Sequence, residues 1–179
     1  MPILGSIIKK AFELRNLPVE KQRRKQNPVT AQKRQLTKLI RKSQFTAIGE
    51  HYGFSKLLQS KNITEEFAET VPMHDYQSMY KRWWYRALNG ESYVAWPGKV
   101  RYFALSSGTS EASSKYIPIT NDMLKGIKQV TLRQLISTTK FDFPLDFYEK
   151  GILMIGGSTH LQYNGTYYEG DLSGITAGN

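Results

Sequence analysis

The chain has 179 residues, a formal net charge of +10 and no cysteine. This length is typical of one domain or of a piece of a larger protein, and the lack of cysteine excludes disulfide scaffolds, thiolate zinc sites, iron–sulfur clusters and cysteine nucleophiles. No apolar run approaches the ~18 residues that span a bilayer, and the first residues lack the pattern of a signal peptide. We therefore expect a cytoplasmic protein.

The positive charge is concentrated in the first quarter of the chain. Residues 1–45 contain 12 lysines and arginines but two acids, whereas the other 134 residues contain 13 residues of each sign. A strongly basic surface can attract nucleic acid or another polyanion. Because apolar residues recur at helical spacing in the same segment, we interpret the charges as the solvated outer faces of two amphipathic helices.

Helices fill the first half of the predicted fold. Apolar pairs four residues apart over residues 3–12 predict a first helix, which Pro18 should end because proline removes a backbone donor. A second helix should begin at Pro28, since proline is favoured in the first helical position, and should run towards Phe45.

Two further helices carry cap signals. Asn62 and Glu65 form a candidate cap pair for a short helix that ends before Pro72. Asp75 is the predicted cap of the clearest helix, which stops at Asn89-Gly90. Aromatic and cationic residues on this helix would suit stacking against single-stranded nucleic acid, but their helical spacing favours core packing. They are Tyr80, Lys81, Arg82, Trp83, Trp84, Tyr85 and Arg86.

Strands are predicted after Pro97-Gly98, where the apolar period changes from helical to alternating. Residues 100–105 indicate a strand, and residues 106–114 indicate a loop rich in Ser and Thr. Residues 115–119 predict a short or edge strand because a proline interrupts them. Thr120 should cap a long helix.

The last part of the chain adds strands without a closing element. Residues 151–155 form an apolar run that predicts a buried strand, and Asn164-Gly165 predicts a β-hairpin. Residues 170–179 are of turn-forming types and suggest truncation, since an incomplete sheet would keep an unpaired edge. The predicted fold class is α/β (mixed), with a helical region over residues 1–98 followed by a partial α/β nucleotide-binding subdomain over residues 99–179.

The segment from Ser106 to Lys115 carries the strongest chemical signal. Gly108 lets consecutive backbone N–H groups turn towards one centre, small hydroxyls add donors, and Lys115 supplies a point charge, a combination that suits a polyphosphate. A solvated Ser/Thr loop is the alternative. The segment is neither a Walker A loop nor a serine-hydrolase elbow around Ser110, because both require a helix where a strand is predicted here.

These residues resemble the nucleotide loop of adenylate-forming enzymes and, more narrowly, that of the acyl-acid amido synthetases of the auxin-responsive promoter (Gretchen Hagen) family. Residues 152–158 and 168–173 are similar to bacterial members of that family. The resemblance implies the N-terminal portion of such an enzyme, with helices followed by part of the mixed sheet of its large domain. The residues that resemble the loop are Ser106, Ser107, Gly108, Thr109, Ser110 and Lys115.

The resemblance implies a two-step ligase that uses Mg·ATP. A carboxylic acid is adenylated with release of pyrophosphate, and an amino acid then displaces AMP to form an amide. The loop residues would bind the β- and γ-phosphates, and Lys115 would act catalytically on the charge of the leaving pyrophosphate. Arg133 would meet the acyl carboxylate, unless it lies on an exposed helix face.

The resemblance also implies which cofactors and partners to expect. We expect ATP and Mg²⁺ as cofactors, no metal bound by protein ligands because the three histidines lack ligand spacing, no nucleic acid or membrane partner, and a full-length monomer. This portion alone should be inactive. The alternative function is a non-enzymatic basic helical module that binds nucleic acid or an anionic surface.

Overall fold

The computed structural model describes residues 3–106, 115–151, 153 and 155–178; the side chains of residues 19, 20 and 22–25 are not among the described parts. The fold is mixed α/β, as predicted, with helices first and a sheet afterwards. No helix within the described ranges combines the length and the apolar composition needed to cross a membrane.

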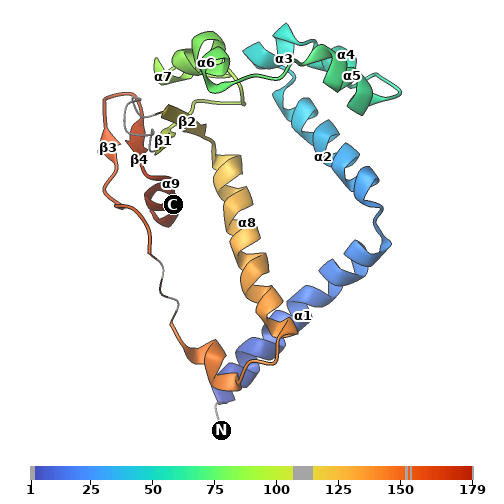
Figure 1. Cartoon of the computed structure of the whole chain (residues 1–179), viewed down its shortest axis with the longest axis vertical. Coiled ribbons are helices and arrows are strands. Elements are labelled where there is room, and N and C mark those ends of the chain that lie inside the picture. The colour runs from blue at the N-terminus through green and yellow to red at the C-terminus, as the bar shows by residue number, and fades with distance from the viewer. Residues whose placement is uncertain (1–2, 107–114, 152, 154, 179) are drawn as a thin grey trace. The chain divides into compact units, whose positions relative to one another are not determined.

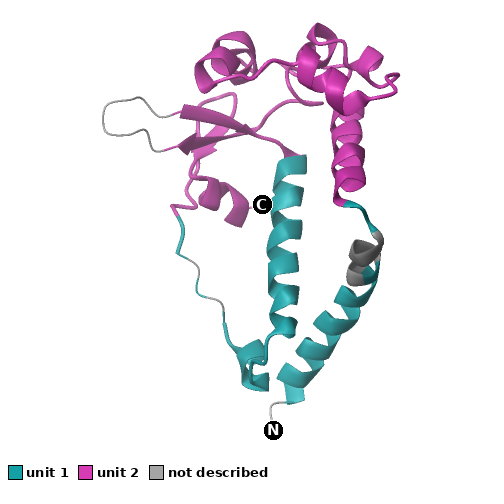
Figure 2. Ribbon diagram, turned by 45° about the vertical axis from the view of Figure 1, so that its right-hand side comes forward, with its two compact units in different colours: residues 1–27, 122–156 teal, residues 28–121, 157–179 magenta. Residues whose placement is uncertain are grey.

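The chain forms two compact units, which Figure 2 colours separately. Unit 1 consists of residues 1–27 and 122–156, and unit 2 consists of residues 28–121 and 157–179. Both units therefore combine segments that are distant in the sequence. The domain boundary expected between residues 98 and 99 stays a prediction.

Unit 1 is built on the contact between its first helix, α1, and the short 3-10 helix η3. Gly5 permits the close approach, because a Cβ at this position would overlap the carbonyl oxygen of Leu145. The Gly5 N–H donates to Glu149 Oε1 at 2.6 Å, which fixes the same contact. The elements are α1, Ile3–Lys25; α8, Asn121–Ser137; η2, Thr138–Lys140; and η3, Leu145–Glu149.

Pro18 lies inside α1, so the predicted helix end at this residue is wrong. Proline removes one backbone donor and crowds the carbonyl one turn earlier, but the helix can continue if it bends slightly. Pro18 and Leu14, which lies one turn earlier, are both exposed. Water can therefore reach the carbonyl that loses its partner.

Unit 2 begins with four helices, of which the first and the last match predicted helices. α2 begins at Pro28, as predicted, and packs against α4 and α5. α5 ends before Pro72, as predicted, and at its start Asn62 Nδ2 donates to Glu65 Oε2 at 2.5 Å. α3 and α4 are too short to show a periodic apolar pattern, which is why they were missed. The bounds are α2, Pro28–Ser43; α3, Ala47–His51; α4, Phe54–Leu57; and α5, Ile63–Thr70.

The helix predicted after Asp75 is present and contains one π-helical turn. Asp75 caps it by accepting a hydrogen bond from the Ser78 backbone N–H at 2.8 Å. It ends at Asn89, followed by Gly90 with a φ of 85°. π turns are rare in proteins overall, but those that occur are often found at functional sites. The segments are α6, Tyr76–Met79; the π turn η1, Tyr80–Trp84; and α7, Tyr85–Leu88.

The hydrophobic core of unit 2 joins its helices to the sheet. Phe103 is fully buried, and its ring centroid lies 4.7 Å from that of Tyr167. Trp83 is 4% exposed, so core packing is confirmed for this residue over an exposed stacking surface. The buried members of the core are Ile40, Tyr52, Phe54, Leu57, Ile63, Trp83, Ala87, Val94, Val100, Phe103 and Tyr167.

The strands of unit 2 form one mixed sheet in the order β2-β1-β4-β3 (Figure 1). β1 pairs antiparallel with β2 and parallel with β4, and β3 pairs antiparallel with β4. β2 lies at the edge, as its proline predicts. β1 is central, and Phe103 and Ala104 are both buried instead of alternating. The bounds are β1, Tyr102–Ser106; β2, Lys115–Ile119; β3, Gln162–Tyr163; and β4, Tyr168–Gly170.

The hairpin predicted at Asn164-Gly165 is confirmed, but the tail after it is helical. Asn164 Oδ1 accepts hydrogen bonds from the N–H groups of Thr166 and Tyr167, each at 3.0 Å, and Gly165 has a φ of 91°. The helix α9, Leu172–Ala177, then packs against β1. The expectation of turn-forming residues without a closing element is therefore wrong, because burial of Ile175 outweighs the local preference of Gly and Ser for turns.

The buried strand predicted over residues 151–155 is also wrong. The described residues of this stretch have no regular structure, and Leu153 and Ile155 are 89% and 96% exposed. An apolar run forms a strand only where a neighbouring strand supplies backbone partners. The described strands pair with one another without this segment.

Candidate functional site

The two ends of the predicted phosphate-binding segment lie opposite each other in the sheet. Ser106 is the last residue of β1, Lys115 is the first residue of β2, and the two are register partners. The segment between them therefore leaves and re-enters the sheet at adjacent antiparallel strands. The predicted site residues Ser107, Gly108, Thr109 and Ser110 lie outside the described residues.

Lys115 contacts an aromatic ring from the helix that Asp75 caps. Its exposed side chain places Nζ 5.3 Å from the centroid of the Tyr76 ring, within the range of a cation–π interaction. The next residue along β2, Tyr116, donates its backbone N–H to the Tyr76 hydroxyl at 2.9 Å. Tyr76 therefore contacts both the side chain of Lys115 and the backbone of the strand that carries it.

Other aromatic rings surround Tyr76 on its own helix. The Tyr80 ring is stacked on it with centroids 5.8 Å apart, and the Trp84 ring meets it edge-on at 5.6 Å. Such pairs are favourable beyond the area they bury. The orientation of Tyr76 is therefore fixed by two rings as well as by its hydrogen bond.

The phenols behind this cluster stay protonated at neutral pH. Burial raises the pKa of Tyr116 and that of Tyr167, and the charge of Glu169 raises both further. The two rings lie 6.3 Å apart in an edge-to-face arrangement. Neither Tyr116 nor Tyr167 therefore adds a negative charge to this region at neutral pH.

Residues 20–173 match the profile of the GH3 family N-terminal domain. The chain belongs to the GH3 family. The match includes Ser106, Lys115 and all the described strands, and it confirms the predicted resemblance to the acyl-acid amido synthetase family. No curated protein and no solved structure matches the chain.

Arg133 of the GH3 chain lies on a different element from the loop ends. It is an exposed residue of α8 in unit 1, whereas Ser106 and Lys115 belong to unit 2. Its side chain is therefore open to solvent, in line with the exposed-face alternative. The contact with an acyl carboxylate stays a prediction.

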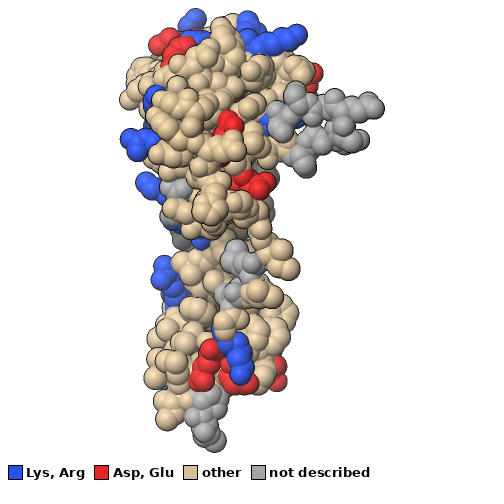
Figure 3. All heavy atoms as spheres, turned by 90° about the vertical axis from the view of Figure 1, so that its left-hand side faces the viewer, with Lys and Arg blue, Asp and Glu red and all other residues tan. Residues whose placement is uncertain are grey.

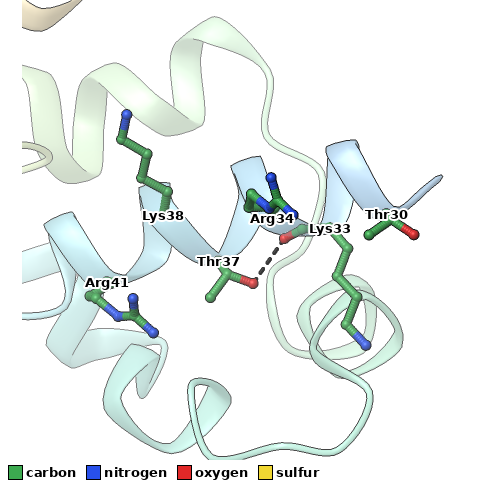
Figure 4. Close-up of a pocket in the computed structure, with 6 residues that line it drawn as sticks. All are labelled: Thr30, Lys33, Arg34, Thr37, Lys38 and Arg41. Atoms are coloured by element: carbon green, nitrogen blue, oxygen red, sulfur yellow. Dashed lines mark hydrogen bonds between the residues drawn. The ribbon is translucent and has the colours of Figure 1, made fainter. Parts of the chain in front are cut away.

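The GH3 helix α2 has a hollow of about 490 Å³ on one side, lined by six of its own side chains. Four of them are cations, and none of these forms an ion pair with an acid of the described residues. Figure 4 shows Lys33 and Lys38 leaving the helix in different directions, so the charges do not converge on one point. The lining residues are Thr30, Lys33, Arg34, Thr37, Lys38 and Arg41.

The surface charge of the GH3 chain is otherwise mixed. On the face drawn in Figure 3, basic and acidic side chains are interspersed. One exposed pair, Lys150 with Asp146, lies one turn apart at 3.9 Å, and Arg86 forms an ion pair with Glu91. The described part of that face therefore carries charges of both signs.

Two of the GH3 histidines take part in contacts near the core. His74 shares hydrogen bonds with the hydroxyls of Tyr52 at 2.7 Å and Ser78 at 3.2 Å, and the His51 ring lies 5.4 Å from that of Trp83. Across the ranges that the structure describes, no three residues among His, Cys, Asp and Glu come together to hold a metal ion.

Sequence reasoning missed Tyr76 as a neighbour of Lys115. In the sequence, Tyr76 is only the first apolar residue after the Asp75 cap, far from Lys115 along the chain. Contacts between such distant residues leave no periodic signal. The π turn that follows Tyr76 likewise has no recognisable residue pattern.

Proposed function

We propose that this GH3 chain supplies the phosphate-binding part of an ATP-dependent acyl-acid amido synthetase. The supporting observation is the register pairing of Ser106 with Lys115, which brings both ends of the Ser- and Gly-rich segment to one end of the β1–β2 pair. Lys115 is exposed, and no described acid forms an ion pair with it. Its charge is therefore available to an anion, and we propose that this anion is ATP, in line with the family resemblance.

The proposed reaction has two steps. A substrate carboxylate attacks the α-phosphate of ATP and pyrophosphate leaves, and the amine of an amino acid then attacks the acyl-adenylate, displacing AMP and forming an amide. Negative charge increases on the pyrophosphate as it leaves. We assign Lys115 to stabilise that charge, and Ser106 with residues 107–110 to bind the phosphates. Mg²⁺ would arrive on the ATP phosphates, which it prefers to an all-protein site.

The remaining assignments complete the proposal. Arg133 would bind the acyl carboxylate. The whole protein would act as a cytoplasmic monomer without a nucleic acid or membrane partner. The helical region 1–98 would support the nucleotide-binding region 99–179, and this portion would not catalyse either step alone.

Pyrophosphate exchange tests this proposal. The protein as it occurs in the cell is incubated with Mg·ATP, labelled pyrophosphate and a panel of aromatic and aliphatic carboxylic acids. We expect labelled pyrophosphate to enter ATP only when a carboxylic acid is present. The label enters ATP by reversal of the adenylation step, and that step requires the acid. Lys115→Ala should reduce the rate by orders of magnitude, since removing one electrostatic donor typically costs ~10²–10³-fold.

Lys56→Ala is the matched control. Lys56 is an exposed lysine of α4 in the same unit, so its loss makes the same charge change away from β2. Exchange should be unchanged in this variant. Unchanged exchange in Lys115→Ala would remove Lys115 from the phosphate site, and exchange independent of any carboxylic acid would argue against adenylation.

A second candidate function, binding of an extended polyanion, is supported by the cationic hollow of α2. Four cations without described ion-pair partners suit a row of negative charges better than one phosphate. Duplex DNA and RNA are the probes. Sub-micromolar affinity that falls steeply with salt, as counterion release requires, would favour this function over the enzyme.

A further inference from the structure

Tyr76 holds the ammonium group of Lys115 over its ring. Lys115 has a long flexible side chain, and it is exposed at the first position of β2. Without a contact its charge would be spread over many rotamers. The 5.3 Å separation between Nζ and the Tyr76 centroid gives the ammonium one preferred position, because the face of the ring carries partial negative charge.

Tyr76 also fixes the backbone next to Lys115. β2 is an edge strand, so the N–H groups on its outer side have no partner strand within the described ranges. The N–H of Tyr116 is one of these, and the Tyr76 hydroxyl accepts it at 2.9 Å. One residue therefore restrains both the strand and the side chain at the end of the segment 107–114.

Two aromatic rings further along the same helical stretch pack against Tyr76. In a regular α-helix, residues eight apart are about 12 Å apart along the axis. The ring centroids of Tyr76 and Trp84 nevertheless lie 5.6 Å apart. The ring of Tyr80 is stacked on that of Tyr76, with centroids 5.8 Å apart. Both Tyr80 and Trp84 belong to the π turn, and Trp83 of the same turn is held in the core with 4% exposure.

We propose that Tyr76 is a positioning residue for Lys115, which rests on the proposed function of Lys115 in binding ATP phosphates. Tyr76 holds the lysine charge at the end of β2 before ATP arrives, so less freedom is lost when the phosphates bind. The effect of Tyr76 therefore passes through Lys115. Its loss should weaken the binding of Mg·ATP and leave the KM for the carboxylic acid unchanged.

A double-mutant cycle tests this inference. Pyrophosphate exchange is measured for Tyr76→Leu, Lys115→Ala and the double variant, with the KM for ATP and that for the acid determined separately. Tyr76→Leu should raise the KM for ATP about three- to tenfold, the range of a cation–π contact. In the Lys115→Ala background the same substitution should change it less than about twofold. Tyr76→Phe, which keeps the ring, should retain most of the affinity.

Tyr85→Leu is the matched control, because Tyr85 is an exposed tyrosine on α7 of the same helical stretch. It should leave both KM values unchanged. An equal effect of Tyr76→Leu in both backgrounds would show that Tyr76 acts only on folding and would overturn the inference. If Lys115→Ala itself leaves exchange unchanged, the proposed function of Lys115 fails, whatever Tyr76 does.

An NMR measurement tests the contact itself without using activity. A ring over the lysine shifts its ε-methylene protons upfield, so the Lys115 signal should move downfield in Tyr76→Leu and stay in place in Tyr76→Phe. If Tyr76→Leu fails to fold, the Lys115 shifts in the unsubstituted protein and in Tyr76→Phe, which keeps the ring, still test the contact. Lys115 ε-proton shifts at the random-coil position in the unsubstituted protein would overturn the inference.

Discussion

Gly174 of α9 lies directly against the carbonyl oxygen of Ser158, which a Cβ at position 174 would overlap. The residues that precede these two also contact each other, because the Gly157 N–H donates to Ser173 Oγ at 2.7 Å. The Gly-Gly-Ser stretch that precedes the hairpin is thus held by the C-terminal helix. The contact of Gly174 is with the Ser158 backbone, which cannot move aside as a side chain can.

Gly174→Ala should therefore destabilise unit 2. Overpacking a buried site typically costs about 1–3 kcal/mol, and chemical denaturation followed by circular dichroism would measure it. Gly126→Ala is the control, since Gly126 lies in α8 with open space where a Cβ would be. That substitution should stabilise the protein by up to about 1 kcal/mol. A neutral Gly174→Ala would contradict the close approach of α9 to Ser158.

Thr46→Val should cost about 1–3 kcal/mol, the range for leaving a buried backbone donor unpaired, here the Gly49 N–H. Thr46 is 1% exposed, and its hydroxyl donates to the Ser43 carbonyl at 2.7 Å and accepts from the Gly49 N–H at 3.2 Å. Valine keeps the shape but makes neither bond. The exposed Thr37, whose hydroxyl bonds one turn back on α2, is the comparison, and Thr37→Val should stay within about 0.5 kcal/mol. Equal losses would mean that burial of Thr46 is not decisive.

Pro18→Ala should stabilise α1 by up to about 3 kcal/mol, because it restores a backbone donor within the helix. Helical ellipticity and slower amide hydrogen exchange around residue 18 would report the gain. Pro28→Ala is the internal comparison. Pro28 stands at the first position of α2, where no donor is needed, so its replacement should be neutral or slightly destabilising. A loss of helicity in Pro18→Ala would contradict a continuous α1.

Asp75 should make stability depend on pH in the acid range. The Ser78 backbone N–H, followed by the Ser78 hydroxyl, lowers the pKa of the Asp75 carboxyl. A carboxyl with a lowered pKa in the folded state stabilises the fold above its unfolded pKa of ~3.9, and this contribution is lost as the pH falls through the folded value. Wild type and Asp75→Ala should therefore differ in Tm at pH 7, and the difference should begin to shrink below about pH 4 and be lost as the pH falls through the lowered folded pKa. Asp142→Ala, at an exposed residue, is the control and should leave the Tm at pH 7 unchanged.

The sequence predicts the fold best where one local signal acts alone. Pro28 marks a helix start, Asp75 marks a cap and Asn164-Gly165 marks a hairpin, and all three are confirmed. Predictions failed where tertiary contacts decide the outcome. The apolar run at residues 151–155 found no strand partner, and the glycine-containing tail became helical because Ile175 is buried.

The candidate site is predictable only in part for the same reason. Ser106 and Lys115 stand out by their motif, and the antiparallel pairing of their strands follows from the short connection between them. Tyr76 does not stand out, because its contact with Lys115 depends on how a helix packs near a sheet edge. The motif therefore indicates Lys115 as a candidate ligand-binding residue, but it does not indicate Tyr76, which contacts Lys115 and is distant from it in the sequence.

The proline of β2 removes a backbone donor from an edge of the sheet. Residues 116 and 118 point their backbone nitrogens to the same side of an edge strand, because successive N–H groups alternate. Pro118 has no N–H, and that of Tyr116 is taken by the Tyr76 hydroxyl. A strand from another molecule would therefore find no free donor at either position, which disfavours intermolecular β-pairing at this edge.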